Sequence, residues 1–132
     1  MRQSRRLRLK SCDAVGDKLF IFAGADTFIL RHLMLGANGI SIATAAVFPQ
    51  ECSQLVQLAK NGQIEEARDI YRRTLIYWND LGFYNCWQSV HKIALQLMGI
   101  IESAQCLKPL TDAEDYQREE IQSLLTFLKK IE

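Results

Sequence analysis

The stretch from Leu19 to Pro49, LFIFAGADTFILRHLMLGANGISIATAAVFP, decides the fold of this chain. Residues 19–22 form an apolar run without polar alternation, which is typical of a strand buried on both faces. Asp26 follows this run and is a suitable N-cap for a helix over residues 27–35. A second apolar run comes at residues 39–43. The stretch therefore predicts a strand–helix–strand unit whose two strands are parallel.

The bulk composition is that of one soluble globular domain. The chain has 132 residues, of which 48% are hydrophobic and 23% are charged, and its net charge is +1. Five basic residues and no acidic residue lie in residues 1–10, and we expect a short basic helix over residues 2–12. This segment lacks interleaved aromatic residues and a recognition motif, which argues against nucleic-acid binding.

No apolar run is long enough to span a bilayer, and the basic segment has too few apolar residues for a membrane-binding face. There is also no hydrophobic core of a signal peptide. The sequence therefore predicts a cytoplasmic protein without a membrane partner.

The cysteines and histidines do not form a recognisable metal motif. Cys12, Cys52, Cys86 and Cys106 are widely spaced without a CxxC pair, and the two histidines stand alone on predicted helices. We expect reduced, buried thiols, no metal site and no cofactor.

The rest of the chain is predicted to be helical. Helical periodicity with suitable ends predicts helices over residues 50–60, from Gln63 to about residue 78, and over residues 83–98. Asn79 belongs to the break between the last two, and Trp87 lies on the apolar stripe of the last, which we expect to be core. Thr111 and Glu114 have the spacing of a capping box before a last helix. Two strands of the buried type do not make an independent sheet with both faces covered, so they need other strands as partners.

Five segments, in this order, carry a resemblance to a known family. They are FAGAD (22–26), LGANGISIATAAVFP (35–49), LVQLAKNGQIEEARDIYRR (55–73), VHKIALQLMGI (90–100) and LKPLTD (107–112). Together they resemble the C-terminal part of the dihydrodipicolinate synthase / N-acetylneuraminate lyase family over about residues 18–132. The resemblance implies an α/β fold, the last two strands of a (β/α)8 barrel followed by a C-terminal helical bundle. Residues 1–60 would be the partial barrel, with the basic helix in front, and residues 61–132 the bundle.

The resemblance also implies an activity. Members of the family are class I aldolases or lyases that hold pyruvate or a related 2-oxo acid as a Schiff base on a lysine. Gly24 matches the glycine that leaves room for the pyruvyl carboxylate, and Asp26 matches an acidic position that contacts substrate hydroxyls. Ser41 falls near the position on the eighth strand whose backbone faces the lysine. Such sites lie at the C-terminal ends of barrel strands.

The sequence also departs from the family pattern. The Schiff-base lysine belongs to a strand upstream of Leu19, Lys10 lies in a basic helical segment, and Lys18 precedes the strand at its N-terminal end. Ala46 stands where the family has asparagine, and the order of Ile40 and Ser41 is altered. The resemblance therefore predicts a truncated family member with no catalytic residue of its own and no activity alone, and it leaves enzyme activity open.

A second hypothesis is a non-catalytic helical module for oligomerisation or interaction. Apolar strands without neighbours favour association. On this hypothesis, another copy of the chain or the barrel strands of another chain would cover them.

Overall fold

The computed structural model describes residues 18–81 and 87–132. The predicted basic helix over residues 2–12 lies outside the described residues, as does the start of the helix predicted from residue 83. The elements in chain order are β1 (Phe22–Ala23), the 3₁₀ helix η2 (Asp26–Phe28), α2 (Ile29–Met34), β2 (Gly39–Ile40), the 3₁₀ helix η3 (Ala43–Ala46), α3 (Pro49–Lys60), α4 (Ile64–Ile70), the π-helical turn η4 (Tyr71–Leu75), α5 (Ile76–Leu81), α6 (Trp87–Leu97) and α7 (Asp115–Phe127).

The strand–helix–strand unit is present, as predicted. β1 and β2 are parallel, with Phe22 opposite Gly39 and Ala23 opposite Ile40. The backbone N–H of Ser41 donates to the carbonyl of Ala23 at 2.8 Å, just beyond the paired residues. Both strands are shorter than predicted: the first covers Phe22–Ala23 instead of residues 19–22. The second ends at Ile40, and the chain turns into η3 at Ala43 instead of continuing the pairing.

The prediction that the first strand is buried on both faces is wrong. Ala23 is buried beside α2, whereas Phe20 and Phe22 are 80% and 58% exposed. Alternate side chains of a strand point to opposite faces, and the two phenylalanines lie on the wall of an open groove whose other wall is α3. One face of this small sheet is therefore open.

The helix predicted from Gln63 is continuous but not uniform. It runs through α4, η4 and α5, with a π-helical turn in the middle. A π turn accommodates an extra residue, so it rotates the residues that follow relative to those before it. Leu75 is the last residue of this turn and Trp78 follows it, and both are fully buried.

The last helix begins later than the predicted capping box. Its N-cap is Glu114, and the Gln117 side chain accepts a hydrogen bond from the Glu114 N–H at 2.9 Å. Thr111 is not the cap, because the residues after it are held in a loop: Asp112 accepts from the N–H of Cys106, and Ser89 accepts from the N–H of Ala113.

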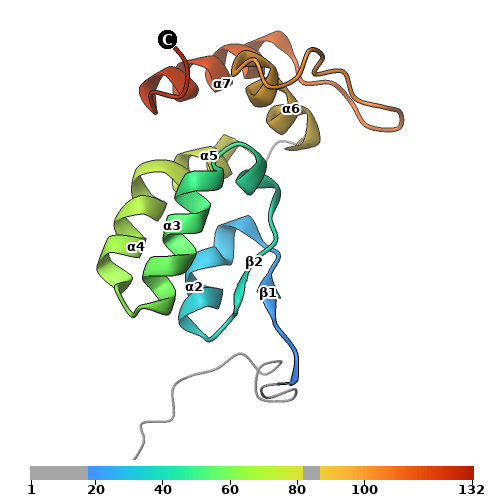
Figure 1. Cartoon of the computed structure of the whole chain (residues 1–132). Helices are drawn as coiled ribbons and strands as arrows, with labels where there is room; N and C mark the ends of the chain where they lie inside the picture. Colours follow the sequence, from blue (N-terminus) through green and yellow to red (C-terminus); the bar gives the residue numbers. More distant parts are fainter. Residues whose placement is uncertain (1–17, 82–86) are drawn as a thin grey trace, which may run out of the picture.

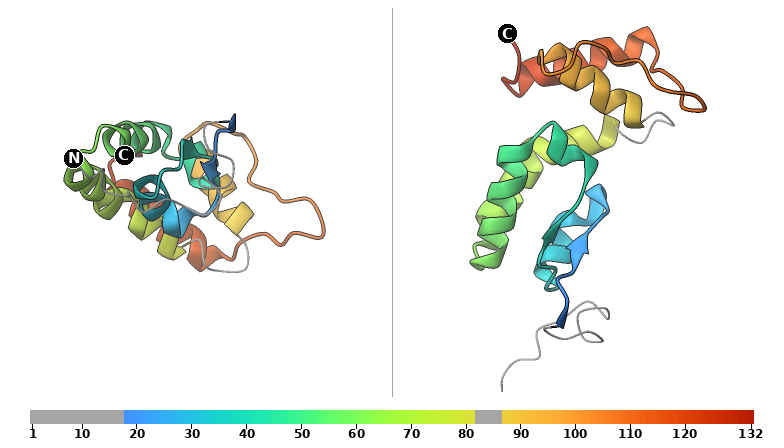
Figure 2. Two further views of the ribbon diagram at one scale, coloured as in Figure 1. Left: turned by 90° about the horizontal axis from the view of Figure 1, so that it is seen from below. Right: turned by 45° about the vertical axis from the view of Figure 1, so that its right-hand side comes forward.

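The two strands, α2, α3 and α4 lie together, and α6 and α7 lie across the other end of the molecule (Figures 1 and 2). One buried cluster joins these parts. Its members come from all of the longer helices and include Ile29, Phe48, Leu55, Trp78, Val90 and Ile121.

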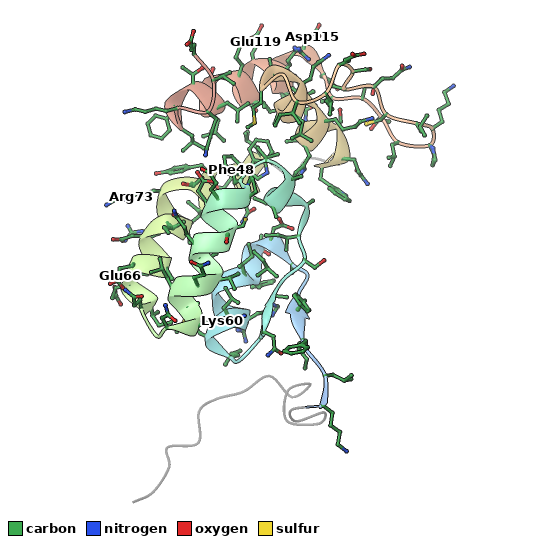
Figure 3. All side chains as sticks on the ribbon, in the orientation of Figure 1. Phe48, Lys60, Glu66, Arg73, Asp115 and Glu119 are labelled. Carbon is green, nitrogen blue, oxygen red and sulfur yellow. The ribbon has the colours of Figure 1, made fainter. Side chains whose placement is uncertain are left out.

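Figure 3 shows Phe48 at the junction, whereas Glu66, Arg73, Asp115 and Glu119 point outward. The Phe48 and Trp78 rings meet edge to face, with centroids 5.2 Å apart. Lys130 pairs with Glu51 and ties the C-terminal segment to α3. The division of the chain at residue 60 stays a prediction. Within the described residues, no helix combines the length and the apolar character that crossing a membrane would require.

Candidate functional site

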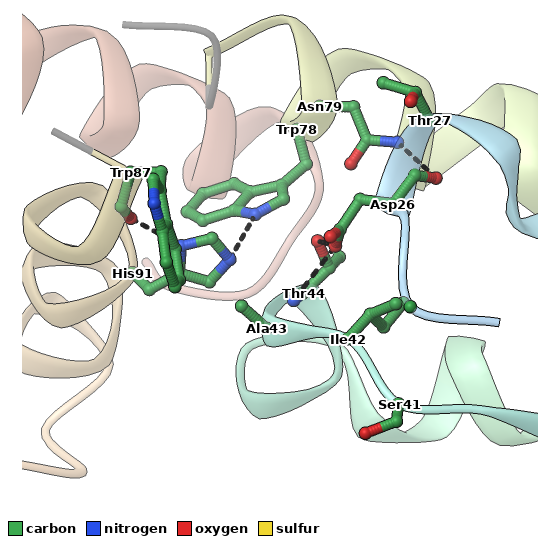
Figure 4. A pocket seen from close by; sticks show the side chains of 11 residues that line it. Asp26, Thr27, Ser41, Ile42, Ala43, Thr44, Trp78, Asn79, Trp87 and His91 are labelled. Carbon is green, nitrogen blue, oxygen red and sulfur yellow. Dashed lines mark hydrogen bonds between the residues drawn. The ribbon is translucent and has the colours of Figure 1, made fainter. Parts of the chain in front are cut away.

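A cavity of about 500 Å³ lies where β1 and β2 end (Figure 4). The carboxyl ends of parallel strands meet at one edge of a sheet, so the loops that follow them share this region. Residues from both loops and from α5 and α6 line it: Gly24, Asp26, Thr27, Ser41, Ile42, Ala43, Thr44, Trp78, Asn79, Trp87 and His91.

The three residues predicted to bind substrate come together here. Gly24 follows β1, Ser41 follows β2, and both are exposed on the cavity wall. A Cβ atom added to Gly24 would lie 3.9 Å from the Ser41 carbonyl oxygen, the nearest heavy atom. The absence of a side chain at Gly24 thus leaves open space in front of the Ser41 backbone.

Asp26 lies beside them. The sequence predicted that Asp26 caps the following helix, and this prediction is wrong. The N-cap is Ala25, without a side-chain bond. Instead, Asp26 Oδ1 accepts hydrogen bonds from the Thr44 N–H, at 3.2 Å, and from the Thr44 hydroxyl. Thr44 is buried in η3, and its donors need an acceptor. The carboxylate therefore joins the two loops that follow the strands.

Asn79 of α5 fixes the same turn from the helical side. Its Nδ2 donates to the Asp26 carbonyl at 3.1 Å, and the side chain is buried. Sequence reasoning assigned Asn79 only to a helix break. No local signal pointed to its role, because the bond spans 53 positions of the chain.

The opposite wall of the cavity is aromatic. The indole Nε1–H of Trp78 donates to His91 Nε2 at 3.3 Å, and His91 Nδ1 lies 2.7 Å from the Trp87 carbonyl. A carbonyl only accepts, so the proton sits on Nδ1 and Nε2 accepts, which is the neutral tautomer. The His91 ring meets both indoles edge to face.

The sequence placed Trp87 on the buried stripe of its helix, and this was wrong. Trp87 is 48% exposed and its ring lines the cavity. Its spacing of four residues from His91 was the available signal, because such residues are neighbours on a helix.

The profile of the dihydrodipicolinate synthetase family matches residues 4–128. The chain belongs to this family.

Two relatives illustrate the match. The chain is 30% identical, over 111 residues, to the 4-hydroxy-tetrahydrodipicolinate synthase of Sulfurihydrogenibium sp., and the match covers 83% of this chain and 37% of that protein. It also matches the crystal structure of N-acetylneuraminate lyase from Fusobacterium nucleatum, with a TM-score of 0.72 and 31% identity, over 92% of this chain and 40% of that one.

The crystal structure of dihydrodipicolinate synthase from Aquifex aeolicus shares the fold, with a TM-score of 0.76 and 24% identity, over 89% of this chain and 40% of that one. The chain thus spans about two fifths of the length of the dihydrodipicolinate synthetase relatives that it matches.

The family resemblance implies a reactive lysine. No lysine in the described ranges 18–81 and 87–132 lines the cavity. Lys18 precedes β1, at the end of the strand opposite the cavity. Lys92 neighbours His91 in sequence, but its ammonium group binds the carbonyl of Gln105. Lys10 lies outside the described residues. The described part of this chain therefore brings oxygen acceptors, an amide and aromatic rings to the cavity, but no amine.

Cys52 is not an alternative nucleophile. It lies in the core on α3. Cys52 and Cys106 are both buried, and neither forms a disulfide. Burial, with smaller contributions from Glu51 and Asp26, raises the pKa of Cys52 to about 12. These two thiols are reduced and buried, as predicted, while Cys12 and Cys86 lie outside the described residues. Among the described residues, no group of three His, Cys, Asp or Glu side chains is placed to hold a metal ion.

Proposed function

We propose that this chain forms part of the substrate pocket of a pyruvate-dependent aldolase or lyase, and that the cavity holds pyruvate or a related 2-oxo acid. The observation that supports this most strongly is the meeting of Gly24 and Ser41 at the carboxyl ends of two parallel strands. Active sites of (β/α)8 barrels lie at that end of the strands. On this proposal β1 and β2 are the last two barrel strands, and the helices after α3 form the bundle.

Each residue at the strand end has a distinct role in this proposal. Gly24 leaves room for the carboxylate of the 2-oxo acid, and the Ser41 backbone borders the reacting carbonyl. Asp26 contacts hydroxyl groups of the substrate through Oδ2, because Oδ1 is occupied by Thr44. The bonds from Thr44 fix the carboxylate in place before substrate binds.

The same cavity lacks the group that would carry out the chemistry. Schiff-base formation needs an amine close to the substrate carbonyl, and no described lysine lines the cavity. We therefore propose that these 132 residues do not turn over substrate by themselves. The amine would come from further barrel strands that pair with the free edges of β1 and β2.

A titration of the ¹⁵N-labelled chain with pyruvate tests the proposal. We expect saturable shifts of the amide signals of Gly24, Ser41 and Asp26, and weaker shifts with lactate, which has the same charge but no keto group. Gly24→Val should abolish the pyruvate shifts, since its side chain fills the space in front of Ser41. Ser123→Val, at an exposed position on α7, is the matched control. Equal shifts in the Gly24→Val chain would overturn the proposal.

A second function, association through the open sheet face, is supported by a separate observation. Leu19, Phe20 and Phe22 are all more than half exposed and lie next to one another on the chain. Exposed apolar clusters beside unpaired strand edges favour contact with another chain. We propose that further barrel strands pair with the strand edge beside this face, or that the face packs against another copy of the chain.

A further inference from the structure

The cavity has two ends of different chemistry. Gly24, Ser41 and the Asp26 carboxylate make up the strand end, which is polar. Trp78, Trp87 and His91 make up the helical end, which is aromatic (Figure 4). A substrate that fills both ends would therefore carry a polar group at one side and an apolar group at the other.

The two tryptophans of the helical end differ in burial: Trp78 is held inside the protein, whereas the ring of Trp87 is partly exposed. Trp78 is fully buried and is held by an edge-to-face contact with Phe48 and by its bond to His91. Trp87 keeps 48% of its surface exposed. An indole left half exposed on a cavity wall is a large apolar surface without a partner, and aromatic rings pack well against it.

His91 adds no charge or free polar atom to this end. Its two ring nitrogens are already engaged by Trp78 and by the Trp87 carbonyl. No arginine or lysine of the described ranges lines the cavity. The helical end thus offers ring faces and ring edges, which suit a planar apolar group better than a carboxylate, an ammonium group or a chain of hydroxyls.

We propose that Trp87 and His91, held in place by the buried Trp78, form a subsite for an aromatic ring, so that the aldehyde partner of the 2-oxo acid carries an aryl group. That the ring belongs to an aldehyde rests on the proposed function, whereas the ring subsite itself rests on the geometry of the cavity. The volume of about 500 Å³ lies within the range of small-molecule pockets.

The two tryptophans provide a direct readout, since they are the only two in the chain and both line the cavity. A ¹⁵N-labelled chain gives one indole signal for each, and Trp87→Phe assigns them. The probes are benzyl alcohol and cyclohexylmethanol, which share a hydroxymethyl group but differ in having a planar or a saturated ring. We expect saturable indole shifts, and at least threefold tighter binding of benzyl alcohol, although the saturated ring is the more hydrophobic.

Two variants locate the binding. Trp87→Leu should remove the preference for the planar ring, and the remaining Trp78 signal shows whether that chain is folded. Phe127→Leu, at another exposed aromatic position on α7, should keep the preference. Equal or weaker binding of benzyl alcohol, or a preference that survives in Trp87→Leu, would overturn the subsite.

The pyruvate titration separates this inference from the proposed function. If pyruvate shifts Gly24 and Ser41 but benzyl alcohol leaves the indoles unchanged, the ring subsite fails and the proposed function stands. If benzyl alcohol binds with the expected preference but pyruvate shifts nothing, the ring subsite stands and its assignment to an aldehyde fails.

Discussion

Asp26 connects the two loops that form the strand end of the cavity. One carboxylate oxygen receives both the N–H and the hydroxyl of Thr44, 18 positions away. Hydrogen bonds to a charged acceptor are stronger than those between neutral groups. The Asp26–Thr44 contact therefore sets the distance between the loops and the orientation of the carboxylate.

Thr44→Val tests this contact, because it removes the hydroxyl and keeps the shape of the side chain. We expect a loss of about 1–2 kcal/mol in the free energy of unfolding, since a partly buried carboxylate loses one donor. Urea unfolding measures the change. Thr126→Val, at an exposed position on α7, should change stability by less than about 0.5 kcal/mol. Equal effects of the two variants would contradict the role of Thr44.

Cys52 makes the stability of the chain depend on pH in the alkaline range. Burial raises its pKa from 9.0 to about 12, so between these values the unfolded chain releases the thiol proton while the folded chain keeps it. Stability falls where the folded state holds more protons, so the contribution is complete below pH 9.0 and is lost as the pH rises toward 12.

The comparison with Cys52→Ala isolates this contribution from those of tyrosines and lysines. We expect the difference in the free energy of unfolding between the parent chain and the variant to shrink as the pH rises above 9.0. Urea unfolding of both chains over this pH range measures it. A difference that does not change with pH would show that Cys52 titrates normally in the folded chain.

At the scale of elements, Gly99 ends α6. Its φ of 72° lies in the left-handed region, which glycine adopts without the steric cost that a Cβ atom brings. Gly99→Ala should therefore cost about 1 kcal/mol of stability. Gly24→Ala is the matched control, because Gly24 lies outside that region and a Cβ atom there has space. Equal losses in thermal unfolding would contradict this account of the helix end.

The elements that the sequence predicted well are those defined by local patterns. The strand–helix–strand unit and the helix that begins at Pro49 follow from apolar runs and from proline and glycine positions. The start of α7 was predicted three residues early, because the preceding loop is held by Ser89, 24 positions from Ala113, and by the bond between Asp112 and Cys106. The π-helical turn in η4 has no local signal either, since it depends on how Leu75 and Trp78 enter the core.

The sequence likewise predicted only part of the candidate site. Gly24, Ser41 and Asp26 were predicted from the resemblance, and the structure brings them to one cavity. Asn79, Trp87 and the pairing of Trp78 with His91 were missed, because helices far along the chain bring them to the strands. Their roles in binding stay predictions.

At the scale of the whole molecule, the open sheet face is the feature that favours association. We expect the chain to self-associate at micromolar concentration, because Leu19, Phe20 and Phe22 expose apolar surface beside an unpaired strand edge. Phe20→Ser should shift the chain toward monomer in sedimentation velocity. Leu107→Ser, at an equally exposed apolar position in the loop before α7, should have no effect. A parent chain that remains monomeric would exclude association between copies.

On the proposed function, the 132 residues hold a 2-oxo acid but lack the amine that reacts with it. Incubation of the purified chain with pyruvate and borohydride, followed by mass spectrometry, tests it directly, because borohydride reduces a Schiff base to a stable adduct on the lysine. We predict no stoichiometric adduct at a concentration of pyruvate that saturates the amide shifts of Gly24 and Ser41. A stoichiometric adduct on one lysine, Lys10 included, would show that the chain supplies the reacting amine itself.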